Sequence, residues 1–191
     1  NGGAGYLGHN NWTLPTTPTY PATDLSCSST GPDYNSFGSG CMNSDIGSLF
    51  YVTLGFQYPD TAVPLPDNAV GPFSNFQPYL YWTETSSASE GNPDGYHTFS
   101  FNTGWRASNV NFHYMYALPM IEGNPFNTIA NDDKMQPSAD GKTIYDPRMD
   151  VTWSADADLA KIMHFGAQCT HPDGTKCINS DGSMTHATAL N

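Results

Sequence analysis

The chain has 191 residues, enough for one domain with a hydrophobic core, and its net charge is −12 with only six Lys and Arg residues. So few basic side chains exclude a basic patch, and with it a nucleic-acid partner or attachment to an anionic membrane surface. Charged residues make up 13%, with 18 Gly and 15 Pro, which is typical of a loop-rich secreted protein with short strands. No apolar run is long enough for membrane insertion.

The first predicted helix spans residues 44–54, and a short extended piece at Trp12–Pro15 precedes it. Ser44 can cap this helix and Gly55 can end it. Its apolar side chains share one face, namely Ile46, Leu49, Phe50 and Leu54. The run Tyr51–Thr53 also favours a strand, which is the competing interpretation.

Four cysteines fall into two local pairs, Cys27 with Cys41 and Cys169 with Cys177. Each pair flanks a loop rich in Gly, Ser, Pro and Asp, so local pairing is the simplest of three connectivities. A bridge from Cys27 to Cys41 would close a loop of roughly 15 residues and contribute about 3 kcal/mol on the chain-entropy model. Zinc is the alternative, but there is no C-x-x-C motif and the six His are scattered. We expect disulfides and an oxidising, extracellular compartment.

A loop and three strands are predicted at the centre of the fold. Residues 59–78 hold five Pro and are expected to form an ordered loop that packs on the core through Val63, Leu65, Val70, Phe73 and Phe76. An antiparallel meander follows, with strands in residues 78–87, 95–109 and 111–123. The middle strand alternates with a period of two over residues 96–103, which indicates one face on a core, and Asn102-Thr103-Gly104 within it has turn chemistry. The third ends at Pro119, which suits a sheet edge.

The remaining residues are predicted to be a linker, a hairpin and the start of a helix. Residues 124–141 are polar and are interpreted as a linker. Residues 142–152 predict a hairpin that turns at Asp146-Pro147, and residues 155–162 a helical turn. Residues 185–191 predict the beginning of a second helix.

Two short boxes resemble a known family. Trp12-Thr13-Leu14-Pro15-Thr16 is similar to its W-R-L-P-T box, and Tyr81-Trp82-Thr83-Glu84 is similar to its Y-W-S-S box. The family is the Lcl C-terminal domain family of secreted bacterial proteins, distantly similar to the formylglycine-generating enzymes. The resemblance implies an α+β, C-type-lectin-like fold with a short antiparallel meander, one or two short helices and long disulfide-stapled loops. It gives a structural role to Trp12, Leu14, Pro15, Tyr81 and Trp82.

The chain departs from that family in two residue patterns and in its order. Thr13 stands where the family has Arg, and residues 115–121 lack the V-R-C-V-R strand in which members often end. Residues 142–159 resemble the family's opening hairpin and residues 183–191 resemble its first helix, yet both follow the meander. The order is therefore cyclically shifted.

Three arrangements explain this shift: one period of a tandem array, a tail that completes a neighbouring subunit, or a permutant that closes within one chain. The chain has no initiator Met or signal peptide, so we expect a processed or excised segment. We expect residues 1–123 to form a body, 124–141 a linker, and 142–191 a segment that completes a domain. The docking side chains are expected to be Ile144, Tyr145, Val151, Trp153, Leu159 and Leu190.

Catalytic motifs are missing from the sequence. It has no G-x-S-x-G, H-E-x-x-H or phosphate-binding Gly loop, and no C-x-x-C-H haem site. No Cys lies between Met42 and Gln168, so the cysteine pair of the formylglycine-generating enzymes does not carry over. We expect no enzyme, no catalytic residue and no cofactor.

Two binding chemistries remain open. Asp pairs in loops could supply calcium ligands, although Asp is also a good turn former; these are Asp156 with Asp158, Asp132 with Asp133, and Asp173 with Asp181. Aromatic side chains could stack on sugars or on a neighbouring subunit, or pack in the core; these are Tyr96, Trp105, His113, Tyr114 and Tyr116.

The sequence therefore predicts an extracellular structural or adhesive module that assembles head-to-tail by exchange of its C-terminal segment. Its partners would be copies of itself or adjacent repeats. The alternative is a monomeric lectin-like domain that binds extracellular glycans or proteins.

Overall fold

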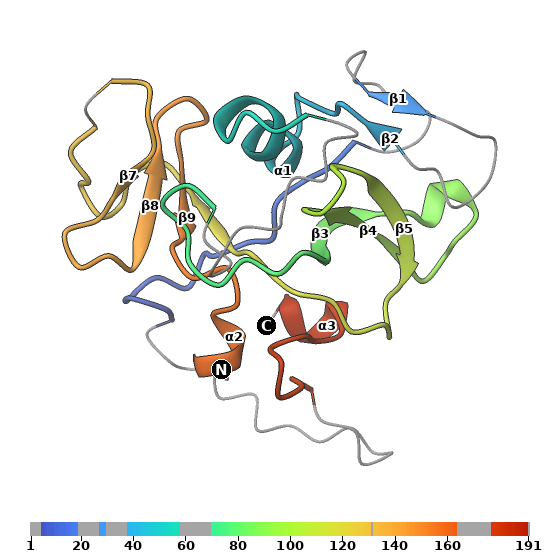
Figure 1. Cartoon of the computed structure of the whole chain (residues 1–191). Coiled ribbons are helices and arrows are strands. Elements are labelled where there is room, and N and C mark those ends of the chain that lie inside the picture. Colours follow the sequence, from blue (N-terminus) through green and yellow to red (C-terminus); the bar gives the residue numbers. More distant parts are fainter. Residues whose placement is uncertain are drawn as a thin grey trace.

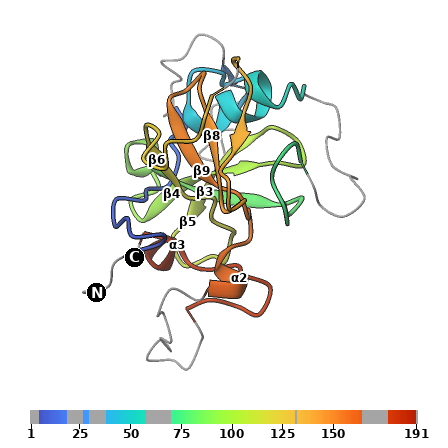
Figure 2. The same ribbon diagram turned by 90° about the vertical axis from the view of Figure 1, so that its left-hand side faces the viewer.

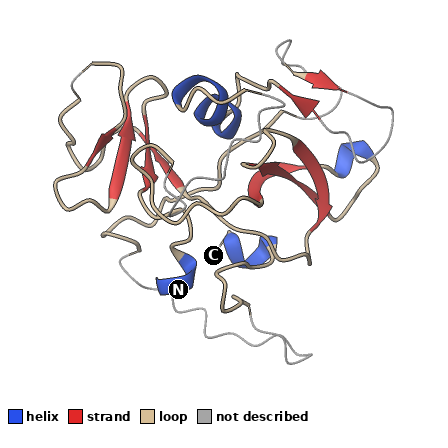
Figure 3. Cartoon of the chain, in the orientation of Figure 1, coloured by secondary structure: helices blue, strands red, loops and turns tan. Residues whose placement is uncertain are grey.

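Two antiparallel sheets organise the chain in this computed structural model, which describes residues 5–18, 27–29, 38–57, 70–130, 132–163 and 177–190. The predicted α+β class is confirmed, with few and short helices (Figure 3). The first sheet, here the meander sheet, has the order β1 (Ser28–Ser29), β2 (Gly38–Ser39), β5 (Arg106–Val110), β4 (Gly95–Ser100) and β3 (Leu80–Ser86). The second, here the hairpin sheet, has the order β6 (Met120–Glu122), β9 (Val151–Ser154), β8 (Thr143–Asp146) and β7 (Gln136–Pro137).

The meander differs from its prediction in two strands. Residues 95–109 are not one strand, because the turn at 101–104 separates β4 from β5. Gly104 has φ +73° in this turn, a conformation that suits Gly, and its carbonyl accepts a hydrogen bond from the Tyr51 hydroxyl at 2.6 Å. Residues 111–119 form no strand of the meander sheet: they lie parallel to β3 at Tyr116 and then lead to β6 in the hairpin sheet, so the predicted antiparallel third strand is wrong. The period-two pattern suggested that the strand continues past residue 100, because Phe101, which lies in the turn, is also fully buried.

The predicted first helix is confirmed as α1 (Asp45–Gly47) continued by η1 (Ser48–Thr53), whose hydrogen bonds are of the π type. The amide of Gly47 donates to Oγ of Ser44 at 3.3 Å, so Ser44 caps the helix as expected. Gly55, with φ +72°, follows its end.

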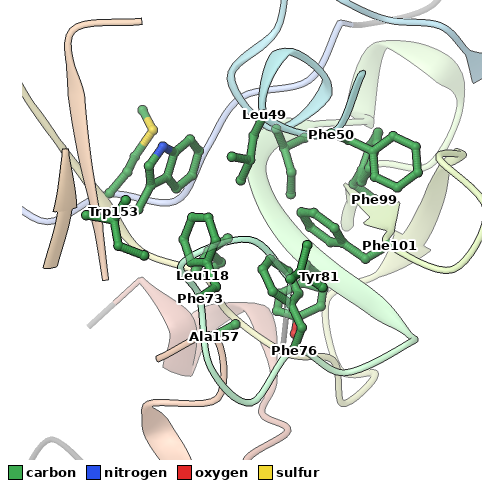
Figure 4. Packing of buried hydrophobic residues seen from close by; sticks show 14 of the residues in the cluster. Leu49, Phe50, Phe73, Phe76, Tyr81, Phe99, Phe101, Leu118, Trp153 and Ala157 are labelled. Atoms are coloured by element: carbon green, nitrogen blue, oxygen red, sulfur yellow. The ribbon is translucent and has the colours of Figure 1, made fainter. Parts of the chain in front are cut away.

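The main core lies between the two sheets, with α1 and η1 over one side (Figures 1 and 4). The helix contributes Leu49 and Phe50, the meander sheet contributes Tyr81 and Phe99, and the hairpin sheet contributes Trp153; all are fully buried. The loop prediction is confirmed at three buried residues, Val70, Phe73 and Phe76. Its other two, Val63 and Leu65, lie outside the described residues.

The C-terminal third contains the predicted hairpin and two short helices. Strands β8 and β9 pair in register from Thr143 with Ser154 to Asp146 with Val151, around a turn at 147–150. Helix α2 (Ala160–Met163) occupies part of the predicted helical turn, and α3 (His186–Ala189) confirms the predicted second helix. Figures 1 and 2 place α2 and α3 at the same end of the molecule, away from α1.

The cysteines behave as expected where they can be described. Cys27 and Cys41 form a disulfide, and Cys177 is also disulfide-bonded. Cys169 lies outside the described residues. No described cysteine is a free thiol, so the zinc alternative is not supported.

Candidate assembly site

Strand β3 carries two adjacent aromatic side chains on its opposite faces, as successive strand residues must. Tyr81 packs in the main core, and its hydroxyl accepts a hydrogen bond from the amide of Gln77 at 2.8 Å. Trp82 packs in a second cluster with Leu14 and Met115. The second box thus faces both clusters at once.

The first box joins three elements through its backbone. Thr13 exchanges backbone hydrogen bonds with Met120 at 2.8 and 2.9 Å, while the amide of Glu84 donates to the Pro15 carbonyl at 3.1 Å. Thr16 donates from its amide and its hydroxyl to Oδ2 of Asp45, at 2.8 and 2.6 Å. The box therefore connects the hairpin sheet, the meander sheet and the start of α1.

The side chains of the first box have different environments. Leu14 and Pro15 are buried. Trp12 is only half-buried: it packs against Tyr6 and Phe126, and its indole donates to the Tyr6 carbonyl at 3.0 Å.

The hairpin β8–β9 docks on the body through one strand pairing and one buried carboxylate. Strand β9 pairs with β6, from Met120 with Trp153 to Glu122 with Val151. Asp146 is fully buried, and its Oδ2 accepts a hydrogen bond from the Thr53 hydroxyl at 2.8 Å. The hairpin is thereby attached to the end of η1 as well as to β6.

Residues 177–190, here the C-terminal tail, dock beside β3. Met184 exchanges backbone hydrogen bonds with Met115 at 2.9 and 2.8 Å, and it also bridges to Ile178. Tyr116 in turn lies parallel to β3, bridged to Tyr81. The tail thus adds an outer position to the edge of the meander sheet, in the manner of β-strand addition.

His186 fixes the end of the tail against the meander sheet. Its ring stacks on Tyr96 with 3.4 Å between ring centroids and meets Trp82 edge-on at 5.2 Å. Nε2 lies 3.0 Å from the Thr83 carbonyl and donates to it, since that oxygen can only accept. The side chain is 2% exposed, and burial lowers the pKa of the imidazole against the opposing effect of the Thr83 hydrogen bond.

The predicted docking residues divide into two groups. Four are buried, namely Ile144, Val151, Trp153 and Leu159. Tyr145 is half-buried and bonds through its hydroxyl to Asp150, and Leu190 is 54% exposed. Sequence reasoning missed Met184 and His186. The turn signal Ser-Asp-Gly between Ile178 and Met184 is the feature that could have indicated a docked hairpin.

The predicted calcium pairs serve turns in the described structure. Oδ1 of Asp156 accepts the amide of Asp158 at 2.9 Å, a local turn contact. Asp132 and Asp133 are exposed, and Asp173 lies outside the described residues. Across the residues that the structure describes, no three His, Cys, Asp or Glu side chains are grouped so as to hold a metal ion.

The aromatic candidates are placed mainly by packing. Tyr96 stacks on His186, and Tyr116 packs against Tyr79 and Tyr81. Trp105 and Tyr114 are half-buried. The exposed member, His113, lies edge-on to the exposed Phe112.

No protein-family model, curated protein or solved structure matches this chain. In the part of the chain that the structure describes, no helix combines the length and the apolar character needed to cross a membrane.

Proposed function

We propose that this protein is an extracellular structural or adhesive module that assembles head-to-tail, with residues 142–191 of one chain completing the fold of the next. The resemblance to the Lcl C-terminal domain family, and with it a C-type-lectin-like form of the α+β fold, is part of the proposal. Disulfide bonding supports an oxidising, extracellular location.

The observation that carries the proposal is the dependence of the body on the C-terminal residues. Trp153 fills the main core and Met184 pairs with Met115 beside β3. The structure makes these contacts within one chain. The same contacts between chains would bury the same surfaces, which is why segment exchange is a low-cost route to assembly. Because each chain would give one segment and receive another, the contact would be heterologous and could extend into a filament.

The connection between the two parts suits a hinge. Asn124 and Thr128 hydrogen-bond to each other, at 2.8 and 2.9 Å, and close a local turn. Beyond it, Ile129 is 78% exposed, and residues 130 and 132–134 are exposed as well. Twelve residues from 124 to 135 would span about 40 Å when extended, enough to reach a neighbouring body. Opening the chain at residues 129–134 would expose little new apolar surface there, because Ile129 is already exposed. Phe126 and Met135, on either side of this stretch, pack on the body.

The test is light scattering with size-exclusion chromatography, and electron microscopy, on the native unreduced chain over a range of concentrations. We expect multimers that grow with concentration. Deleting residues 129–134 should favour multimers because a short hinge hinders closure within one chain, whereas adding six Gly/Ser residues there should favour monomers. Exchange would be ruled out if the native, the shortened and the lengthened chain all gave uniform particles with the mass of a single chain, 20.7 kDa for the native chain.

Closure within one chain favours a second function, a self-contained lectin-like domain that binds extracellular glycans or proteins. In that case the native chain and the lengthened chain would both be monomers. A glycan array probed with the monomer would then be the informative measurement, and binding by a monomer would support this second function over assembly.

A further inference from the structure

The carboxyl group of Asp158 is buried directly beneath the C-terminal tail. Asp158 is 3% exposed, and its Oδ1 has no hydrogen-bond partner among the described residues. Gly182 of the tail lies so close that an added Cβ would collide with this oxygen. Oδ2 lies 4.0 Å from Nζ of Lys161, whose side chain is 54% exposed. A carboxylate in this place is neither hydrated nor well paired, and ionising it is costly.

The charges around Asp158 do not offset this cost. Burial is the main cause that raises the pKa of Asp158, to about 7, and the nearby Asp156 and Asp181 raise it further. Lys161 alone acts in the opposite direction. Asp181 belongs to the tail itself, so an ionised Asp158 would repel the segment that covers it.

Three other titratable groups that face this site do not change their charge near neutral pH, namely Asp181, Tyr81 and Tyr116. Hydrogen bonds from Ser183 lower the pKa of Asp181 although its partial burial opposes them, so Asp181 carries its charge at neutral pH. Burial raises the pKa of the Tyr81 and Tyr116 hydroxyls, and both are neutral there. Asp158 is therefore the carboxyl at this contact that changes charge near neutral pH.

We propose that Asp158 is a proton-dependent latch for the C-terminal tail: its neutral carboxyl fits beneath Gly182, and its ionisation loosens residues 178–184. The direction follows from proton linkage. A released tail exposes Asp158 to water, where it ionises near its ordinary value of about 4. The docked state thus binds more protons than the released state between about pH 4 and 7. Docking therefore weakens as the pH rises from about 4 to 7, and it stays weakened above 7.

Trp82 provides a direct reporter of docking. Its indole Nε1 donates to the carbonyl oxygen of Met184 in the tail at 2.9 Å, and it is fully buried. Trp12 donates instead to the carbonyl of Tyr6, which does not belong to the tail, and serves as the internal reference. The chain has four Trp, so each ring labelled with 5-fluorotryptophan can be assigned in a ¹⁹F NMR spectrum by replacing that Trp with Phe.

The experiment is a ¹⁹F titration of the native, unreduced chain between about pH 4 and 8, which covers the interval in which docking should weaken. We expect the Trp82 signal to leave its docked position as the pH rises, with a midpoint between about pH 4 and 7, while the Trp12 signal stays constant. Asp158→Asn, which has the same shape but cannot ionise, should abolish the transition. Lys161→Met should move its midpoint to higher pH, because an exposed cation that lowers the pKa is removed.

Three results would overturn the latch: a Trp82 signal that is constant over this range, a transition that persists in Asp158→Asn, or a midpoint unmoved in Lys161→Met. The Lys161 variant keeps the test decisive if Asn disturbs the fold at position 158. The latch concerns docking within one chain. It stands or falls independently of exchange between chains, which is judged by molecular mass.

Discussion

The indole of Trp82 and the carbonyl of Met184 form a 2.9 Å hydrogen bond across 102 residues of sequence. Trp82 belongs to β3 and Met184 to the C-terminal tail, so this contact joins two segments that lie far apart in the sequence. The Met184 carbonyl also accepts the amide of Met115 at 2.9 Å. One tail oxygen therefore binds both β3 and the segment at Met115.

Trp82→Phe should lower the free energy of unfolding by about 1–3 kcal/mol, because it removes a buried hydrogen bond and part of a fully buried ring. Urea denaturation followed by circular dichroism measures this loss. Trp12→Phe is the matched control, since Trp12 is only half-buried and its indole bonds to Tyr6 and not to the tail. An equal loss in both variants would contradict the central role of Trp82.

Asp146→Ala should cost about 2–4 kcal/mol of stability, because Asp146 is fully buried and holds both the hydroxyl of Thr53 and the amide of Arg148. Thr53→Val removes only the first of these bonds and should cost about 1 kcal/mol. The double variant measures their coupling, which should be about 1 kcal/mol if the bond joins the hairpin to η1. Strictly additive losses would show that it does not.

His186 should make the chain less stable as the pH falls below about 6.5. Its pKa is lowered by burial in the folded state, so the unfolded chain binds a proton first and unfolding is favoured as the pH falls from 6.5 to the folded pKa. Asp158 acts in the opposite direction between about pH 4 and 7, so the difference between wild type and His186→Gln isolates the imidazole. Denaturation at several pH values should show that the free energy of unfolding falls less steeply below pH 6.5 in the variant than in the wild type. Parallel curves would refute the role given to the His186 imidazole.

Gly104→Ala should destabilise the chain more than Gly141→Ala. Both glycines have positive φ, +73° and +69°, so each substitution introduces backbone strain of about 1–2 kcal/mol. An added Cβ at Gly104 would also press on Phe50 and Tyr51, whereas nothing lies near Gly141. Thermal unfolding of the two variants separates the steric cost from the shared strain. Equal melting temperatures would mean that the turn shifts to make room.

The sequence predicted the elements whose signals are local. Ser44 and Gly55 marked the two ends of the first helix, and the two cysteines of the first pair were close enough to be matched. The β8–β9 hairpin was also predicted, because its apolar residues and turn stand close together in the chain.

The failures came from contacts between distant segments. Residues 111–119 look like a strand of the meander, yet they pair with the tail and then lead into the other sheet. The sequence did not indicate that His186 docks on the meander sheet, because its partners Thr83 and Tyr96 lie about a hundred residues away in sequence. Leu190, chosen for its apolar side chain, follows the last residue of α3 and is exposed, although it stands four residues after the buried His186. Apolar character alone does not tell where the packed part of a short helix ends.

Thr13 uses only its backbone to bind Met120, and its side chain faces solvent. The residue at this position can therefore change size, polarity or charge without disturbing the pairing beneath it. Position 13 is therefore an exposed site whose side chain the surrounding fold does not require. Substitution at position 13 can thus alter the surface chemistry of this chain while its architecture stays the same.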